Sequence, residues 1–257
     1  MEAAHFIFWE ALKVVCLALL GLLGAKAVAS LWLLPREDGL RKPKGVQFSL
    51  YAVMAALCGL GAWNVGFDTA AEVYYWGSES YMSKGQTGEA YLDALRAVEL
   101  RPGNLSYWRA LAQSKLYARQ FDSLLADRPA FQHLSGGALD ENDEYRFALC
   151  HFYLGHYPQV IQMADQLIGQ NRGYAAPYIL RGMSLIAEKN YPEAERTFLS
   201  VLQLYPGNQA AVEGLAHVYF LTGQRRRAVA VLNETGKFSF PADVRKRFEA
   251  LKGLYAQ

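Results

Sequence analysis

The stretch that decides the fold is HYPQV at His156–Val160, which returns as NYPEA at Asn190–Ala194, 34 residues later. In both copies a proline stands where it is tolerated best, in the first turn of a helix. The turn Pro-Gly-Asn at 102–104 returns at 206–208, three such periods later with two residues over. A fixed period of this length indicates stacked helical hairpins, each of which buries its apolar face against its neighbours.

The period divides the second part of the chain into repeats. They lie near 71–104, 105–140, 141–174, 175–208 and 209–242, and a capping helix follows at 243–257. The two extra residues fall in the second repeat, around Pro129. Small residues such as Gly182 and Ala194 let two antiparallel helices approach, and Pro206 ends a second helix because it cannot continue the hydrogen-bond ladder. We therefore expect an all-α superhelical solenoid, with one polar face of the last helix toward solvent.

This spacing resembles the tetratricopeptide repeat (TPR) family over about 185 residues from Ala71 onward. The repeat that opens at Ala175 carries the residue types of the family at Tyr178, Gly182, Ala194, Phe198 and Pro206. Two residues depart from the pattern, because Arg181 stands where the family has Leu and Leu124 where it has Ala. The resemblance implies that the first helices of the repeats line a groove in which partner proteins bind.

The resemblance also implies which side chains line this groove, since the family uses fixed positions of each first helix. These groove residues are Tyr75, Arg109, Gln113, Tyr117, Tyr145, Tyr153, Ile179, Met183, Glu213 and His217. Leu149, Phe152 and Ile186 share the register, and packing between repeats explains them equally well. Only Arg109 and Asn142 suit a clamp for a C-terminal carboxylate. An aromatic and aliphatic floor instead suits a helix or an extended peptide.

Two apolar segments precede the repeats and predict a membrane anchor at 1–67. Residues 46–67 form a run of 22 residues without a charge, long enough for the roughly 30 Å hydrocarbon core. Residues 6–34 form a second expected span, although Glu10, Lys13 and Lys26 are costly near its centre. The alternative for residues 6–34 is a secretory signal peptide with a cleavage site near Ala27. The acidic residues at the start of the chain oppose this alternative, because signal peptides begin with a basic region.

The loop at 35–45 sets the orientation of the anchor. It carries four basic residues, whereas the twenty residues after the second span carry one, Lys84. By the positive-inside rule this loop is cytoplasmic. We therefore expect a two-pass protein of the lipid bilayer with its repeats outside the cytoplasm, which in a bacterium means an inner-membrane protein facing the periplasm.

Composition and motifs argue against several classes of function. The 26 Lys and Arg nearly balance the 24 Asp and Glu, so a nucleic-acid partner is not expected. None of the usual zinc, haem, P-loop or nucleophile signatures occurs, so we expect no metal, no cofactor, no small-molecule substrate and no enzymatic activity. Cys150 is interpreted as a small core residue, and His5 as an interfacial histidine without a ligand.

The sequence thus predicts a non-catalytic, membrane-anchored scaffold or accessory subunit that binds other proteins of a membrane or envelope complex. The alternative is an assembly chaperone that holds a client peptide in the groove. That alternative rests on a layout similar to the two-span TPR proteins of cytochrome c maturation. A third, weaker interpretation is an enzyme or pigment-binding subunit, which would depend on His5 or the surroundings of Cys150.

Overall fold

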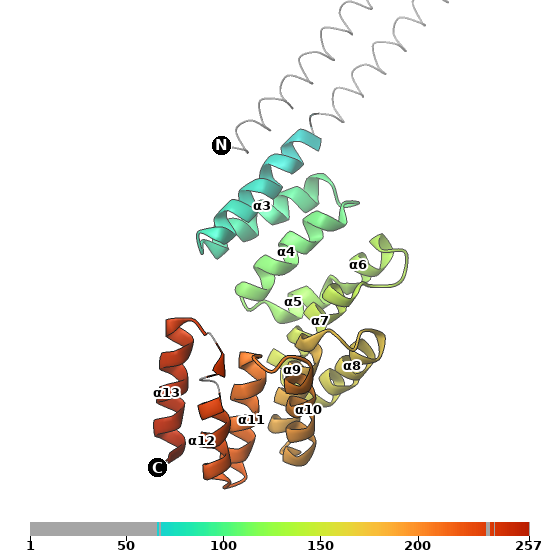
Figure 1. Cartoon of the computed structure of the whole chain (residues 1–257). Coiled ribbons are helices and arrows are strands. Elements are labelled where there is room, and N and C mark those ends of the chain that lie inside the picture. Colours follow the sequence, from blue (N-terminus) through green and yellow to red (C-terminus); the bar gives the residue numbers. More distant parts are fainter. Residues whose placement is uncertain (1–65, 67, 235–236, 239, 257) are drawn as a thin grey trace, which may run out of the picture. The chain divides into compact units, whose positions relative to one another are not determined.

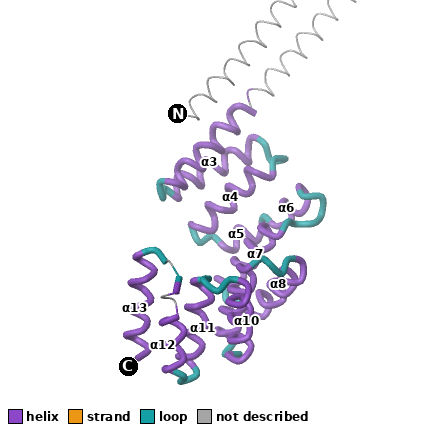
Figure 2. The backbone as a smooth tube through the Cα atoms, viewed as in Figure 1, coloured by secondary structure: helices purple, strands orange, loops and turns teal. Residues whose placement is uncertain are grey.

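The computed structural model describes residue 66 and residues 68–234, 237–238 and 240–256. Within these residues all regular structure is helical (Figure 1 and Figure 2). The expected span at 6–34, the loop at 35–45 and residues 46–65 of the second span lie outside the described residues. Among the helices that are described, none combines the length and the apolar character needed to cross a bilayer.

The helices follow one another along the chain as a series of helical hairpins. Residues 68–83 form a helix, here called the entry helix, which is drawn without a label before α3 in Figure 1. The labelled elements are α3 (Thr87–Leu100), α4 (Leu105–Tyr117), α5 (Phe121–Ala126), α6 (Arg128–Leu134), α7 (Glu141–Tyr153), α8 (Tyr157–Gln170), α9 (Ala175–Ala187), α10 (Tyr191–Leu204), α11 (Gln209–Leu221), α12 (Arg225–Glu234) and α13 (Ala242–Ala256).

The chain divides into two compact units, Met1–Arg119 and Gln120–Gln257. The described helices of the first unit are the entry helix, α3 and α4. The second unit holds α5 to α13. The boundary falls inside the second repeat that the period predicts. This repeat is also the irregular one, because two short helices, α5 and α6, stand where a single second helix is expected.

Local chemistry explains where the helices begin and end. Asn104, Asp140 and Asn208 cap α4, α7 and α11, since each side-chain oxygen accepts a hydrogen bond from a backbone N–H of the first turn. The turns inside three hairpins use Gly85, Gly155 or Gly223 at φ 74°, 80° and 75°. A residue in the left-handed region therefore ends the first helix and lets the chain reverse.

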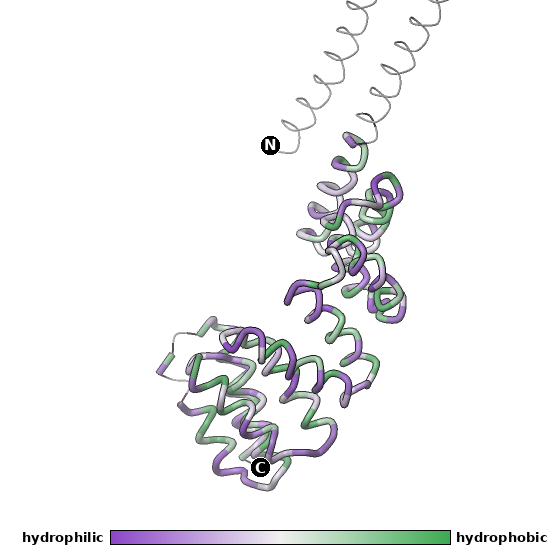
Figure 3. Tube along the Cα trace, turned by 90° about the vertical axis from the view of Figure 1, so that its right-hand side faces the viewer, coloured by the Kyte–Doolittle hydropathy of each residue, from purple (hydrophilic) through white to green (hydrophobic). Residues whose placement is uncertain are grey.

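Each hairpin buries one side of its helices, and polar and apolar stretches alternate along them (Figure 3). The core of the first unit is made of Ala94, Ala97, Tyr107 and Leu111 with their neighbours. The largest core of the second unit centres on Phe198, which is fully buried. Its ring lies between α9 and α11 over two glycines, so the small residues of the repeat pattern make room for a large one.

Candidate protein-docking site

The groove residues of the first unit lie on the entry helix and on α4. Tyr75 is half-buried, with its ring 5.4 Å from the ring of Tyr107. Arg109 and Gln113 are also half-buried, whereas Tyr117 at the end of α4 is 61% exposed. Tyr117 is therefore the member of this set that offers the most surface to a partner.

In the second unit, α7 supplies Tyr145 and Tyr153, which differ in exposure. Tyr153 is 54% exposed, and its ring stacks on Phe121 at 4.8 Å with 11° between the planes. Tyr145 is half-buried with its ring 5.7 Å from Tyr174. Burial raises the pKa of Tyr145 to about 12, so its hydroxyl stays protonated near neutral pH and can donate a hydrogen bond.

The next first helix, α9, places Ile179 and Met183 at corresponding positions. Ile179 packs partly against the large core, while Met183 is 44% exposed. Tyr153 and Met183 are consequently the exposed apolar groove residues of this unit. Of the three residues whose role was left open, Leu149 and Phe152 pack against the core cluster of α7 to α9, and Ile186 against the large core.

The last two groove residues, Glu213 and His217 on α11, contact the capping helix α13. Arg247 donates from Nη2 to Glu213 Oε1 at 2.8 Å, and Tyr255 Oη lies 3.3 Å from His217 Nδ1. Tyr255 also stacks on Phe220 at 4.5 Å. These side chains are thus engaged within the chain and leave less surface for a partner than the pattern implied.

The pKa values of this cluster follow from burial. Burial raises the pKa of Glu213, against the opposing effect of Arg247, and it lowers the pKa of His217. Sequence reasoning missed Arg247 and Tyr255 as residues of this surface. The sequence nevertheless contains a signal for Arg247, because Arg247 follows Glu213 by one period of 34 residues. It therefore continues the same row of first-helix positions.

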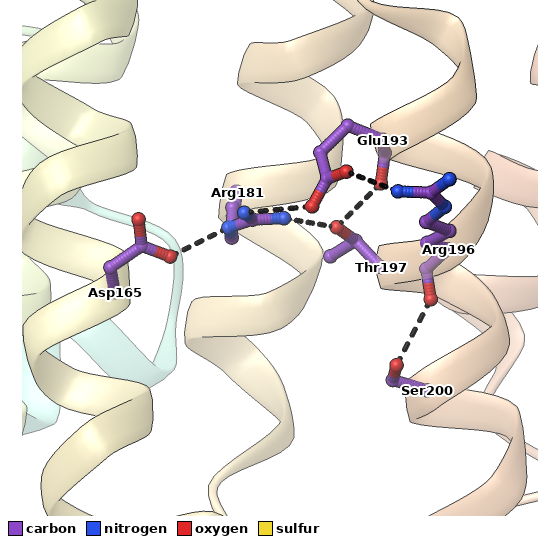
Figure 4. A network of polar contacts seen from close by, with 6 residues as sticks. All are labelled: Asp165, Arg181, Glu193, Arg196, Thr197 and Ser200. Atoms are coloured by element: carbon purple, nitrogen blue, oxygen red, sulfur yellow. Dashed lines mark hydrogen bonds and ion pairs between the residues drawn. The ribbon is translucent and has the colours of Figure 1, made fainter.

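Arg181, which stands where the family has Leu, is the centre of a polar network (Figure 4). It donates from Nε to Asp165 Oδ1 at 2.7 Å and from Nη2 to Glu193 Oε1 at 3.2 Å. A third hydrogen bond goes to Thr197 Oγ1. The side chain is only 18% exposed, so the network links α8, α9 and α10 and explains why a charged residue is tolerated there.

The described residues offer little that resembles an active site. Cys150 is buried, and burial raises the pKa of its thiol to about 12, which keeps it protonated and unreactive. Among the residues with described positions, no three His, Cys, Asp or Glu side chains gather into a metal-binding group. His5 lies outside the described part of the chain.

Comparison with known proteins agrees with this architecture. Residues 185–245 match the family model described as "Tetratricopeptide repeat". A tetratricopeptide repeat protein from Parabacteroides merdae is similar in structure, with a TM-score of 0.61, 18% identity and 82% of each chain covered. A thermophilic TPR protein from Thermus thermophilus has a TM-score of 0.57 at 15% identity, covering 71% of this chain and 98% of that one.

A third similar structure is PilF of Pseudomonas aeruginosa, with a TM-score of 0.53, 15% identity and coverage of 74% of this chain and 90% of that one. A search of curated protein sequences finds no match. At these identities the solved structures show the fold. Together with the matched repeats, they confirm the TPR solenoid that the 34-residue period predicted.

Proposed function

We propose that this chain is a non-catalytic scaffold or accessory subunit that binds other proteins through the first helices of its repeats. The observation that carries the proposal is the exposure of Tyr153 and Met183, at 54% and 44%, on two consecutive first helices of one unit. Aromatic side chains and methionines that remain exposed on a rigid scaffold are typical of protein-binding surfaces.

The chemistry of this surface favours an apolar segment of a partner. Tyr153 rests on Phe121 and is held in place by it, so it offers a rigid aromatic anchor. Tyr145 adds a hydroxyl donor nearby on the same helix. Since α13 contacts the groove residues of α11, the binding surface of this unit lies chiefly over α7 and α9.

The membrane anchor and the side of the membrane belong to the same proposal. Residues 68–83 are helical, so the first repeat begins directly after the apolar run that ends at residue 67. We place the repeats outside the cytoplasm because the basic residues gather in the loop at 35–45. The partners would then be proteins of a membrane or envelope complex, close to the bilayer surface.

A second function is favoured by Met183. A flexible thioether that is 44% exposed adapts to clients of different shape, as an assembly chaperone requires. Co-purification at a fixed stoichiometry supports the subunit, whereas transient and saturable binding of a client peptide supports the chaperone.

Gentle detergent extraction with identification of the bound proteins tests the proposal. The double variant Tyr153→Ala/Met183→Ala is compared with Leu199→Ala/Leu204→Ala, which removes comparably exposed apolar side chains from the second helix α10. We expect the first variant to lose a partner that the second variant and the wild type retain. Equal loss or equal retention by both variants would contradict the proposed surface.

A further inference from the structure

We propose a metal site in the turn of the α7–α8 hairpin, where His151 and His156 bind one zinc ion through their Nδ1 atoms. These two atoms lie 3.2 Å apart. Gln159 on α8 orients the ring of His151, and water completes the coordination shell of the ion. The proposal does not rest on the scaffold function.

The backbone of the turn holds the two histidines together. The N–H of His156 donates to the carbonyl of His151 at 2.9 Å, and the N–H of Gly155 donates to the carbonyl of Phe152 at 3.0 Å. Gly155 has the left-handed φ of 80° that this way of ending a helix requires. Both histidines are therefore fixed on a hydrogen-bonded turn before an ion arrives.

The same turn recurs in three other hairpins with different side chains. The residue pairs joined there by the corresponding backbone hydrogen bond, at 2.8–2.9 Å, are Tyr81–Gln86, Leu185–Asn190 and Tyr219–Gln224. The fold therefore requires a histidine at neither position. Of these four turns, only that between α7 and α8 has an imidazole at both positions.

The spacing of the two ring nitrogens fits one shared ion. Zinc binds histidine nitrogens at about 2.0–2.1 Å in tetrahedral geometry, so two nitrogens on one ion lie about 3.3 Å apart. The 3.2 Å between the Nδ1 atoms of His151 and His156 agrees with this value. Ligands at right angles, as on square-planar or octahedral ions, would lie about 2.9 Å apart. The geometry thus favours zinc.

Gln159 supplies the partner that a metal-binding histidine needs on its other nitrogen. Its Nε2 lies 3.2 Å from His151 Nε2. A half-turn of the amide brings its oxygen to this place, where it accepts the Nε2–H and leaves the lone pair of Nδ1 for the ion. Without an ion, the Nδ1–H of one ring donates to Nδ1 of the other. The metal replaces this shared proton.

The surroundings of the pair also suit a cation. Burial lowers the pKa of His151, and His156 and Arg128 lower it further, so the ring is neutral near pH 7, as a metal ligand must be. The charge of Arg128 is compensated, because its Nη2 donates to both carboxylate oxygens of Glu144 at 2.8 Å. His156 is exposed, so an ion can reach the pair from solvent.

The sequence signatures for zinc do not cover such a pair. Its two histidines are five residues apart across a turn, whereas the usual helical signature places them four apart on one helix. Two protein ligands are also fewer than the three of a catalytic zinc site. We therefore expect an open site that binds zinc more weakly than a structural zinc site does.

Titration of zinc chloride into the full chain tests the proposal. The chain carries no histidine tag, is freed of metal with a chelator and is kept in detergent micelles, and isothermal titration calorimetry gives the affinity. The double variant His151→Tyr/His156→Gln takes the side chains of the Tyr81–Gln86 and Tyr219–Gln224 pairs, so it preserves the turn. The control His133→Ala removes an exposed histidine of α6.

We expect the wild type and His133→Ala to bind zinc at least about tenfold more tightly than the double variant. His156→Gln alone, at an exposed position, should weaken binding by a similar factor. Nuclear magnetic resonance of the ¹⁵N-labelled rings should show coordination at Nδ1 of both histidines. Equal affinity of the wild type and the double variant, an equal loss in His133→Ala, or coordination through Nε2 would overturn the proposal.

Discussion

At the scale of single residues, the contact of Phe198 with two glycines decides how closely three helices pack. A Cβ on Gly182 would come within 2.9 Å of three ring atoms of Phe198, and one on Gly214 within 2.8 Å. Distances this short cannot be relieved without moving the ring or a helix. The two glycines and the phenylalanine therefore specify the spacing of α9, α10 and α11 together.

The change Gly214→Ala tests this packing. We expect it to lower the free energy of unfolding by about 1–3 kcal/mol, because the added methyl group overpacks the core. Gly169→Ala in α8 is the matched control, since a Cβ there meets nothing within 4 Å. The control should be neutral or stabilise the protein by up to about 1 kcal/mol. Urea unfolding followed by circular dichroism measures both, and a neutral Gly214→Ala would show that the ring moves freely.

The cluster of His217, Glu213, Arg247 and Tyr255 predicts a dependence of stability on pH. Burial lowers the pKa of His217 below its usual 6.5, so the folded chain binds a proton less readily than the unfolded chain. The neutral ring of His217 stabilises the folded chain at pH values above the unfolded-state pKa of 6.5. This stabilisation is lost as the pH falls from there through the lowered pKa of the folded chain. His217→Gln should therefore reduce the drop in Tm between about pH 7.5 and about pH 5.5. An unchanged drop would show that other groups, such as His151, cause it.

The sequence-based predictions and the structure differ at particular residues, and the differences have physical reasons. The period identified Gly182, Ala194 and Phe198 as packing residues because their sizes recur at fixed spacing. It could only mark Arg181 as a departure, since its partners Asp165, Glu193 and Thr197 come from two other helices, α8 and α10. Contacts of this kind depend on how helices cross, which a one-dimensional pattern does not contain.

At the scale of elements, α13 continues the row of first helices and closes the stack. Its apolar side joins the large core through Val244, Phe248 and Tyr255, which are 7%, 1% and 4% exposed. The sequence predicted a final helix with one polar face. It did not predict that this helix would contact Glu213 and His217, because the groove positions were carried over from a family pattern that ends with the last repeat.

Phe248→Ala should be among the most destabilising changes in this helix. Removing a fully buried ring is expected to cost about 3–5 kcal/mol, through lost burial and the cavity left behind. Leu254→Ala, on the same helix and 54% exposed, is the control and should change the stability by no more than about 0.5 kcal/mol. Thermal unfolding of both variants provides the comparison. Similar Tm values would mean that α13 adds little to the core.

At the scale of the whole molecule, the orientation of the chain in the membrane is the prediction with the widest consequences. Arg172→Cys in the exposed turn before α9 should react with a membrane-impermeant maleimide in intact cells. Lys42→Cys in the predicted cytoplasmic loop should react only after lysis. The buried Cys150, with a pKa of about 12, stays unlabelled in both and serves as an internal control. The reverse labelling pattern would place the repeats in the cytoplasm.

The central claim is that the first helices of the repeats bind another protein. Photo-crosslinking in the native cell tests it most directly, with a photoreactive residue at position 183 on α9 or at position 199 on α10. Both positions are comparably exposed, at 44% and 39%. The account predicts a discrete protein crosslinked at position 183 and none at 199. Crosslinks at 199 but not at 183, or at neither position, would contradict it.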